Sequence, residues 1–174
     1  MKIIRKIENI WQKRGNVTMV GIKIQIPYHY NQAFLAILKE VPIGDYNWEI
    51  GNDKALCYDA GVLCTELYDR FFETGRLDGE AFSRCISREE YYIICAEVAA
   101  YPAGEAAHSE IKTYRDFQKS QCALYLLCKD IVGYELYVKD PVLLAQIFAR
   151  CAAVPNWAVT PLAPPEKNKS LKVW

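Results

Sequence analysis

Histidine is scarce in this chain of 174 residues, which has only His29 and His108. Imidazole is the side chain best suited to acid–base and metal chemistry near neutral pH, so its scarcity disfavours much of that chemistry. His29 stands between two tyrosines and is expected at the surface or near a helix start. His108 lies in a polar stretch between Glu105 and Glu110, where a solvated loop is expected and a carboxylate site is the alternative.

The short motifs of common enzymes are also missing. The sequence contains no P-loop, GxGxxG, GxSxG or HExxH, and so no recognisable phosphate cradle, dinucleotide turn, nucleophile elbow or zinc helix. No stretch approaches the ~20 apolar residues of a membrane span, and no secretory apolar region follows the basic start. The sequence therefore favours a protein that is not an enzyme, and predicts no cofactor, metal or membrane span.

An excess of charge of one sign is missing too, since Lys plus Arg and Asp plus Glu both number 21. Nucleic acid is therefore not an expected partner, because its binding depends on phosphate neutralisation. Residues 1–18 nevertheless carry a net charge of +4, which leaves −4 for residues 19–174. We interpret residues 1–18 as a basic extension ahead of a natural start at Met19. A short amphipathic helix that touches a membrane or a partner is the alternative.

Cysteine is present, but not in the spacing of a metal site. The seven cysteines form no CxxC pair and indicate free thiols in a reducing compartment, so the expected location is the cytoplasm. Most of them lie in apolar runs, where cysteine packs as a small hydrophobe. Cys85 is the exception, because Arg84 and Arg88 flank it and nearby cations lower a thiol pKa.

The apolar periodicity of residues 19–174 predicts a single α+β domain, with a mostly antiparallel sheet and helices packed mainly on one face. Val20–Ile26 alternates as a half-buried strand, and "YYIICAEVAAY" at 91–101 is the expected central strand. The other expected strands start at Tyr46, follow a hairpin turn at 51–53, and lie within 122–131, 133–140 and 157–162. Helices are expected over 30–41, after Asp78, over 113–119 and after Asp140, and residues 163–170 are expected to form a mobile tail.

The stretch "PIGDYNWEIG" at 42–51 holds an aromatic pair, Tyr46 and Trp48. Both fall on one face of an alternating strand, with Asn47 and Glu49 on the other. Aromatic residues in such a pattern most often lie in the core, because their burial supplies much of a domain's stability. The alternative is an exposed pair that anchors a partner, since alternation does not say which face is buried.

Acidic residues gather around the same segment, at Asp45, Glu49, Asp53 and Asp59. A solvated acidic edge that discourages aggregation explains them. Two alternatives stay open: a divalent-metal site, if the loops converge, and a surface for a basic protein partner. By analogy only, some bacterial immunity proteins neutralise cationic toxins through acidic surfaces.

Several motifs carry a resemblance to a known family: "YNW" at 46–48, "AYPAG" at 100–104, "IKTYRDF" at 111–117, "SQCALYLL" at 120–127 and the terminal "VW". Together they resemble a family of short, uncharacterised Gram-positive bacterial proteins known as a domain of unknown function, over about residues 20–174. The resemblance implies an intracellular bacterial protein and brings no activity or catalytic residue.

Two functional classes stay open. The first is a non-enzymatic protein-binding domain, such as an inhibitor or immunity-type protein, for which the candidate binding residues are Asp45, Tyr46, Trp48, Glu49, Asp53 and His108. The second is a small enzyme that uses the thiol of Cys85 or Cys57, or a metal held by the acids around 45–59. The oligomeric state and the identity of the partner do not follow from the sequence.

We predict that residues 1–18 are dispensable for folding, because their charge differs from that of the rest and Met19 opens the first predicted strand. A chain starting at Met19 should unfold within ~1 kcal/mol of the full chain in thermal or chemical denaturation. A larger loss would mean that the leader packs on the core.

Overall fold

The computed structural model describes residues 18–28, 30–59, 62–63, 71–72, 75–104, 110–166 and 168–173. Residues 1–17 of the basic extension and His108 lie outside these ranges. The strands are β1 (Gly21–Gln25), β2 (Tyr46–Asp59), β3 (Val62–Leu63), β4 (Arg76–Leu77), β5 (Tyr91–Pro102), β6 (Leu124–Asp130), β7 (Gly133–Val138) and β8 (Ala158–Leu162). The helices are α2 (Ala33–Ile37), η1 (Ile43–Asp45), α3 (Gly79–Ile86), α4 (Tyr114–Lys119) and α5 (Pro141–Ala152).

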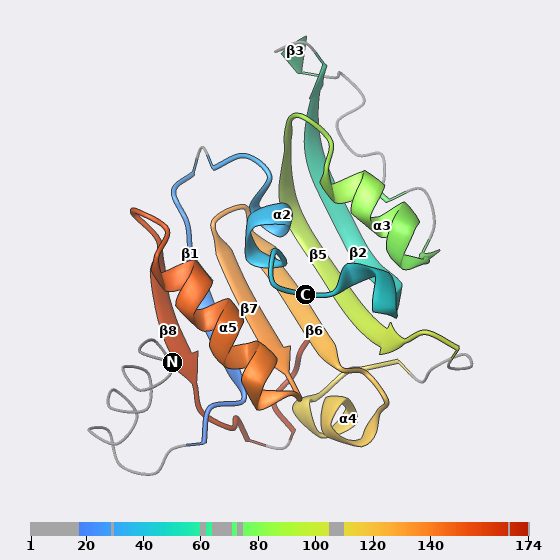
Figure 1. Cartoon of the computed structure of the whole chain (residues 1–174), viewed down its shortest axis with the longest axis vertical. Coiled ribbons are helices and arrows are strands. Elements are labelled where there is room, and N and C mark those ends of the chain that lie inside the picture. Colours follow the sequence, from blue (N-terminus) through green and yellow to red (C-terminus); the bar gives the residue numbers. More distant parts are fainter. Residues whose placement is uncertain are drawn as a thin grey trace.

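The strands form one antiparallel sheet in the order β3-β2-β5-β6-β7-β1-β8, with the short β4 paired to β2 (Figure 1). As predicted, the apolar run 91–101 is a central strand, β5, flanked by β2 and β6. The expected α+β class with a mostly antiparallel sheet is therefore confirmed.

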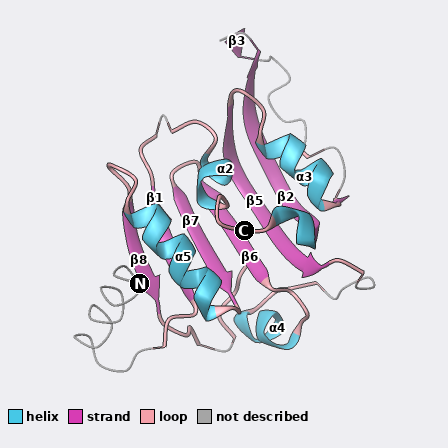
Figure 2. Ribbon diagram, viewed as in Figure 1, coloured by secondary structure: helices cyan, strands magenta, loops and turns pink. Residues whose placement is uncertain are grey.

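Helices α2, α3 and α5 cover one face of the sheet (Figure 2). They bury Phe34, Ile37, Phe82, Leu144 and Ile147 in a large apolar core against the inward side chains of the strands. This arrangement confirms the expected packing of helices mainly on one face, because the antiparallel sheet needs an apolar layer on at least one side.

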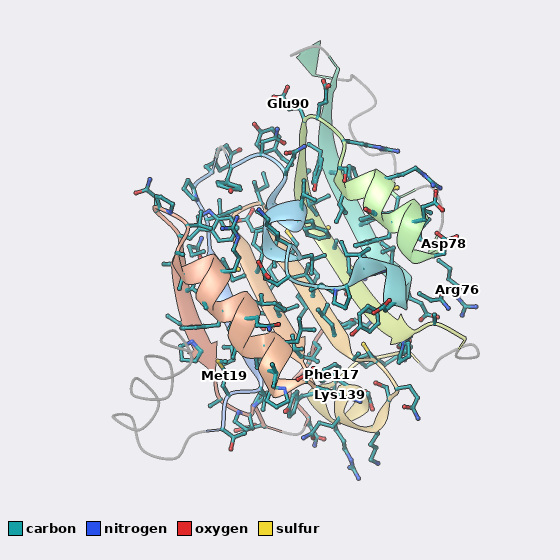
Figure 3. The ribbon with its side chains drawn as sticks, viewed as in Figure 1. Met19, Arg76, Asp78, Glu90, Phe117 and Lys139 are labelled. Atoms are coloured by element: carbon teal, nitrogen blue, oxygen red, sulfur yellow. The ribbon has the colours of Figure 1, made fainter. Side chains whose placement is uncertain are left out.

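The opposite face carries a second, smaller core rich in tyrosine. Tyr125 and Tyr137 of the sheet pack there against Tyr114 and Phe117 of α4, and Leu171 of the C-terminal segment is fully buried among them. At the edge of this core, Lys139 Nζ lies 5.3 Å from the centre of the Phe117 ring (Figure 3). Both faces of the sheet are thus covered, but by different kinds of side chain.

Local capping signals place the helices where the sequence predicts them. The Asp78 side chain accepts from Ala81 N at 2.7 Å at the start of α3. Thr113 and Asp116 form the expected capping box of α4. Asp140 caps α5, and Pro141 occupies its first turn. These are local interactions within a few residues, so the sequence alone reveals them.

Three expectations are wrong. The chain does not form a hairpin turn at 51–53, because β2 continues from Tyr46 to Asp59 through a β-bulge. The helix expected over 30–41 contains only Ala33–Ile37, since Gln32 takes a left-handed conformation with φ 56°. The tail at 163–170 is not free, because Ser170 pairs with Thr113 in an isolated antiparallel bridge.

In the part of the chain that the structure describes, no helix combines the length and apolar character needed to cross a membrane.

The Trp48 ring is wholly buried and stacks on Phe82, with 3.9 Å between ring centroids and 5° between planes. Its indole Nε1 donates to Ile43 O at 3.1 Å. The core reading of the aromatic pair is therefore right for Trp48.

We predict that Trp48→Ala lowers the free energy of unfolding by about 3–5 kcal/mol, because it leaves a large cavity between β2 and α3. Urea denaturation measures this, with Val142→Ala as a control at a side chain that is 63% exposed. The control should change stability by less than about 0.5 kcal/mol. A similar small change for Trp48→Ala would contradict the packing described above.

Candidate functional site

The site begins with the bulge in β2. Gly51 pairs with Glu97 while Lys54 pairs with Cys95, which leaves two residues of β2 opposite one of β5. Within the bulge Asn52 has φ 47°, a left-handed conformation that asparagine tolerates better than most residues. Cys95 Sγ donates to Asn52 O at 3.2 Å. Bulges commonly redirect a side chain, and this one directs the Asn52 amide to Glu97.

Glu97 is a carboxylate in the middle of the central strand, and only 3% of it is exposed. Its Oε1 accepts from Asn52 Nδ2 at 3.1 Å and from Val173 N at 3.0 Å. Its Oε2 accepts from Lys172 Nζ at 2.9 Å and from the Tyr125 hydroxyl at 3.4 Å. Donors from β2, β6 and the C-terminal segment therefore converge on one buried charge.

Lys172 bridges two carboxylates. Its Nζ lies 2.9 Å from Glu97 Oε2 and 2.8 Å from Glu110 Oε1, while Lys112 Nζ lies 3.1 Å from the other Glu110 oxygen. Glu97 is buried and Glu110 is more than half exposed. The ammonium of Lys172 thus stands where the buried part of the site meets the solvent.

The electrostatics of this bridge follow from its geometry. Partial burial by itself lowers the pKa of Lys172, but the hydrogen bonds and charges of Glu110 and Glu97 outweigh it and hold the pKa above its usual value. Hydrogen bonds from Lys172 and Lys112 lower the pKa of the exposed Glu110 carboxyl. At neutral pH the Lys172 ammonium therefore stays charged between Glu97 and Glu110.

Beside the bridge lies an open pocket with a volume of about 340 Å³. Its charged groups are Glu49, Glu97, Glu110 and Lys172, so carboxylates outnumber cations among the lining residues. Its other lining residues are Ile50, Gly51, Asn52, Ala99, Tyr101, Ile111 and Tyr125. Acidic groups with apolar walls between them suit a cation on an aliphatic stem, because the walls can pack the stem while the acids pair the charge.

Glu49 is the predicted site residue that the fold brings to this pocket. Its Oε1 lies 3.2 Å from Arg76 Nε of the neighbouring β4. Figure 3 shows Arg76 near Asp78 at the outer edge of the sheet. Glu49 and Glu110 are the more exposed acids that line the pocket, and Glu97 is the buried one. We therefore call Glu49 and Glu110 the rim of the pocket and Glu97 its floor.

The other predicted site residues do not gather there. Trp48 is buried on the opposite face, and the half-buried Tyr46 packs edge-on against it at 6.1 Å. Asp45 is exposed in η1. The Asp53 carboxylate accepts from Phe72 N at 3.1 Å, which is a structural contact. His108 lies outside the described residues, so the structure leaves its role as a prediction.

Within the described ranges, no group of three or more His, Cys, Asp or Glu residues is placed to hold a metal ion. Asp45, Glu49 and Asp53, three of the acids considered as metal ligands, have the separate surroundings given above. The side chain of Asp59 lies outside the described part.

Sequence reasoning missed Glu97, Asn52, Tyr125 and Lys172. A signal for Glu97 was present, because it is the one acid inside the apolar run "YYIICAEVAAY". A carboxylate in a strand buried on both faces needs a partner. Asn52 was assigned to a turn, and Lys172 follows a segment expected to be mobile, so neither was linked to Glu97.

Comparison with known proteins gives a family but no activity. A family model described as a protein of unknown function, DUF2691, matches residues 19–158. The chain is also similar to the uncharacterized protein YncE of Bacillus subtilis (strain 168), with 27% identity over 128 residues, 74% of this chain and 81% of that protein. No solved structure matches. The resemblance to a bacterial domain of unknown function is thereby confirmed, and the chain belongs to the DUF2691 family.

Proposed function

We propose that this protein is a non-enzymatic cytoplasmic binding protein, of the inhibitor or immunity type, that receives a basic side chain of a protein partner in the Glu97 pocket. The observation that carries the proposal is a buried carboxylate beside an open pocket, neutralised by a lysine of the C-terminal segment. A cation of the partner fits the same position, because a buried carboxylate is stable only with a counter-charge.

The acidic charge at the rim of the pocket is an argument for a protein as the partner. Glu49 and Glu110 line the pocket, and Asp45, exposed in η1, precedes Glu49 in the chain. Exposed acids accelerate the approach of a basic partner through long-range attraction, and this effect weakens with salt. We propose that the contact surface comprises this acidic segment and the excursion from Pro102 to Ile111.

The alternative function, a thiol enzyme, receives little support from the described cysteines. Cys95, Cys122, Cys128 and Cys151 are buried. Burial raises the pKa of Cys122, Cys128 and Cys151 to about 12, so these groups stay protonated at neutral pH. Cys85 is only partly buried and lines a small hollow of about 180 Å³ together with Arg84 and Arg88.

We predict that Cys122, Cys128 and Cys151 do not react in the native protein at pH 8, because thiolate is the reactive form and their pKa values are about 12. Timed alkylation followed by peptide mass spectrometry measures each site, and protein unfolded in guanidinium is the control in which all of them should react. Cys85 should be modified before them. A Cys85 rate far above that of a free model thiol would instead favour the enzyme.

The binding proposal is tested by native pull-down from cells that make the protein, followed by kinetics with the captured partner. Glu49→Gln removes a rim charge, and Glu80→Gln removes the same charge from an exposed site on α3, on the other face. We expect Glu49→Gln to lower the association rate roughly threefold at low salt and to flatten its salt dependence, with little effect from Glu80→Gln.

Equal association rates and salt dependences for the two variants would mean that the acidic rim does not contribute to the interaction. If no protein partner is captured, the proposal fails, and small ligands or chemistry return as the function.

A further inference from the structure

We propose that the group received by the pocket is the primary ammonium of a partner lysine, and that Lys172 holds this position as an internal competitor until the partner displaces its side chain. This inference rests on the proposed function. It adds the chemical identity of the recognised group. It also adds a way in which the protein's own C-terminal segment sets the concentration at which a partner binds.

The Lys172 ammonium marks the position of the cation. Its Nζ contacts one oxygen of the buried Glu97 at 2.9 Å and one oxygen of the exposed Glu110 at 2.8 Å. An ammonium has three donors that can point to separate acceptors. The two carboxylates therefore form a site for a compact point charge shared between the floor and the rim of the pocket.

A guanidinium fits the same carboxylates less well. Arginine pairs best when its two parallel N–H groups reach both oxygens of one carboxylate. In Glu97, Oε1 is already taken by Asn52 Nδ2 and Val173 N, so only Oε2 faces the cation. The neutral donors around Glu97 therefore select lysine over arginine.

The side chain of Lys172 can leave without unfolding the segment that carries it. The backbone on its N-terminal side is fixed, because Leu171 is fully buried and its N donates to Lys112 O at 2.9 Å. Tyr114 N also donates to Lys169 O at 3.1 Å. The Lys172 side chain is itself 23% exposed, so rotation about its own bonds takes the ammonium into solvent.

The pocket beside this ammonium has room for a second aliphatic stem, with Ile50, Ala99 and Ile111 among its walls. An incoming lysine can therefore approach Glu97 before Lys172 has left. A tethered group competes at an effective concentration in the millimolar range. Lys172 should thus raise the concentration at which any external amine binds, and only a partner with further contacts along the acidic rim should displace it.

The test uses the full chain labelled with ¹⁵N and two probes of equal charge, N-acetylated octalysine and octaarginine. Chemical-shift changes of the backbone amide signals of Gly51, Asn52 and Glu97, measured in about 0.15 M salt, report binding at the pocket itself. We expect octalysine to bind there at least about fivefold more tightly than octaarginine. Octaarginine that binds equally well or better would overturn the assignment of an ammonium.

Displacement is tested with Lys172→Met and its matched control Lys112→Met. Both remove one positive charge beside Glu110, but only Lys172 also contacts Glu97. We expect Lys172→Met to tighten octalysine binding about tenfold, which corresponds to about 1.4 kcal/mol, and Lys112→Met to change it by less than about twofold. An equal effect of the two variants, or weaker binding by Lys172→Met, would overturn the competition.

A measurement on the wild-type protein covers the case in which Lys172→Met does not fold. In the ¹⁵N-labelled protein the Lys172 ammonium gives its own side-chain signal, because its hydrogen bonds to both glutamates slow proton exchange with water. This signal should be visible at mildly acidic pH in the free protein and disappear when unlabelled octalysine saturates the pocket. A signal that is unchanged at saturation would overturn the displacement.

Failure of this inference and failure of the proposed function are separable. The captured partner and Glu49→Gln test whether a basic protein binds at the rim, and the oligopeptides test which group enters the pocket. A partner that depends on Glu49, together with octalysine that leaves the pocket amides unshifted, would refute the lysine inference alone.

Discussion

The burial of Glu97 is the constraint around which the second face of this protein is organised. A carboxylate removed from water loses several kcal/mol of hydration, and removal of one partner from a buried pair typically costs about 3–5 kcal/mol. Glu97 receives donors from the β2 bulge, from β6 and from the C-terminal segment. Segments far apart in the sequence are therefore held on the same face by a single charge in the central strand.

The two faces of the sheet differ in the kind of side chain that they bury. Trp48, Phe82 and the other side chains under α2, α3 and α5 form an apolar core whose burial supplies most of the folding energy. On the opposite face the tyrosines combine apolar surface with a donor. Burial, and then the nearby Glu97 charge, raises the pKa of Tyr125, so its hydroxyl stays protonated and donates to the carboxylate. The tyrosine-rich face can therefore bury a glutamate and still pack its rings closely.

The C-terminal segment joins the two halves of the second face. At one point Lys172 pairs with Glu97, and at another Lys169 Nζ lies 3.7 Å from Glu135 of β7. Burial alone would raise the pKa of Glu135, but Lys129, Lys169 and the Tyr137 hydroxyl outweigh it and lower the pKa below its usual value. Two lysines therefore fasten a polar segment to two glutamates of the sheet, with Leu171 buried between them.

The sequence by itself determined the features that depend on neighbouring residues: the alternation of β1, the apolar strand β5, and the caps at Asp78, Thr113 and Asp140. It also favoured a core position for Trp48 over an exposed anchor, and the fold buries Trp48. Glu49 was a candidate binding residue, and it lines the pocket, but its role in binding stays a prediction. Only the tertiary structure decided that Asn52 and Asp53 form a bulge and not part of a turn. A turn and a bulge use the same residues with left-handed conformations and differ in the strand that pairs with them. Only the tertiary structure brought Asn52, Tyr125 and Lys172 to Glu97, since hydrogen bonds across 45, 28 and 75 residues leave no periodic trace in the chain.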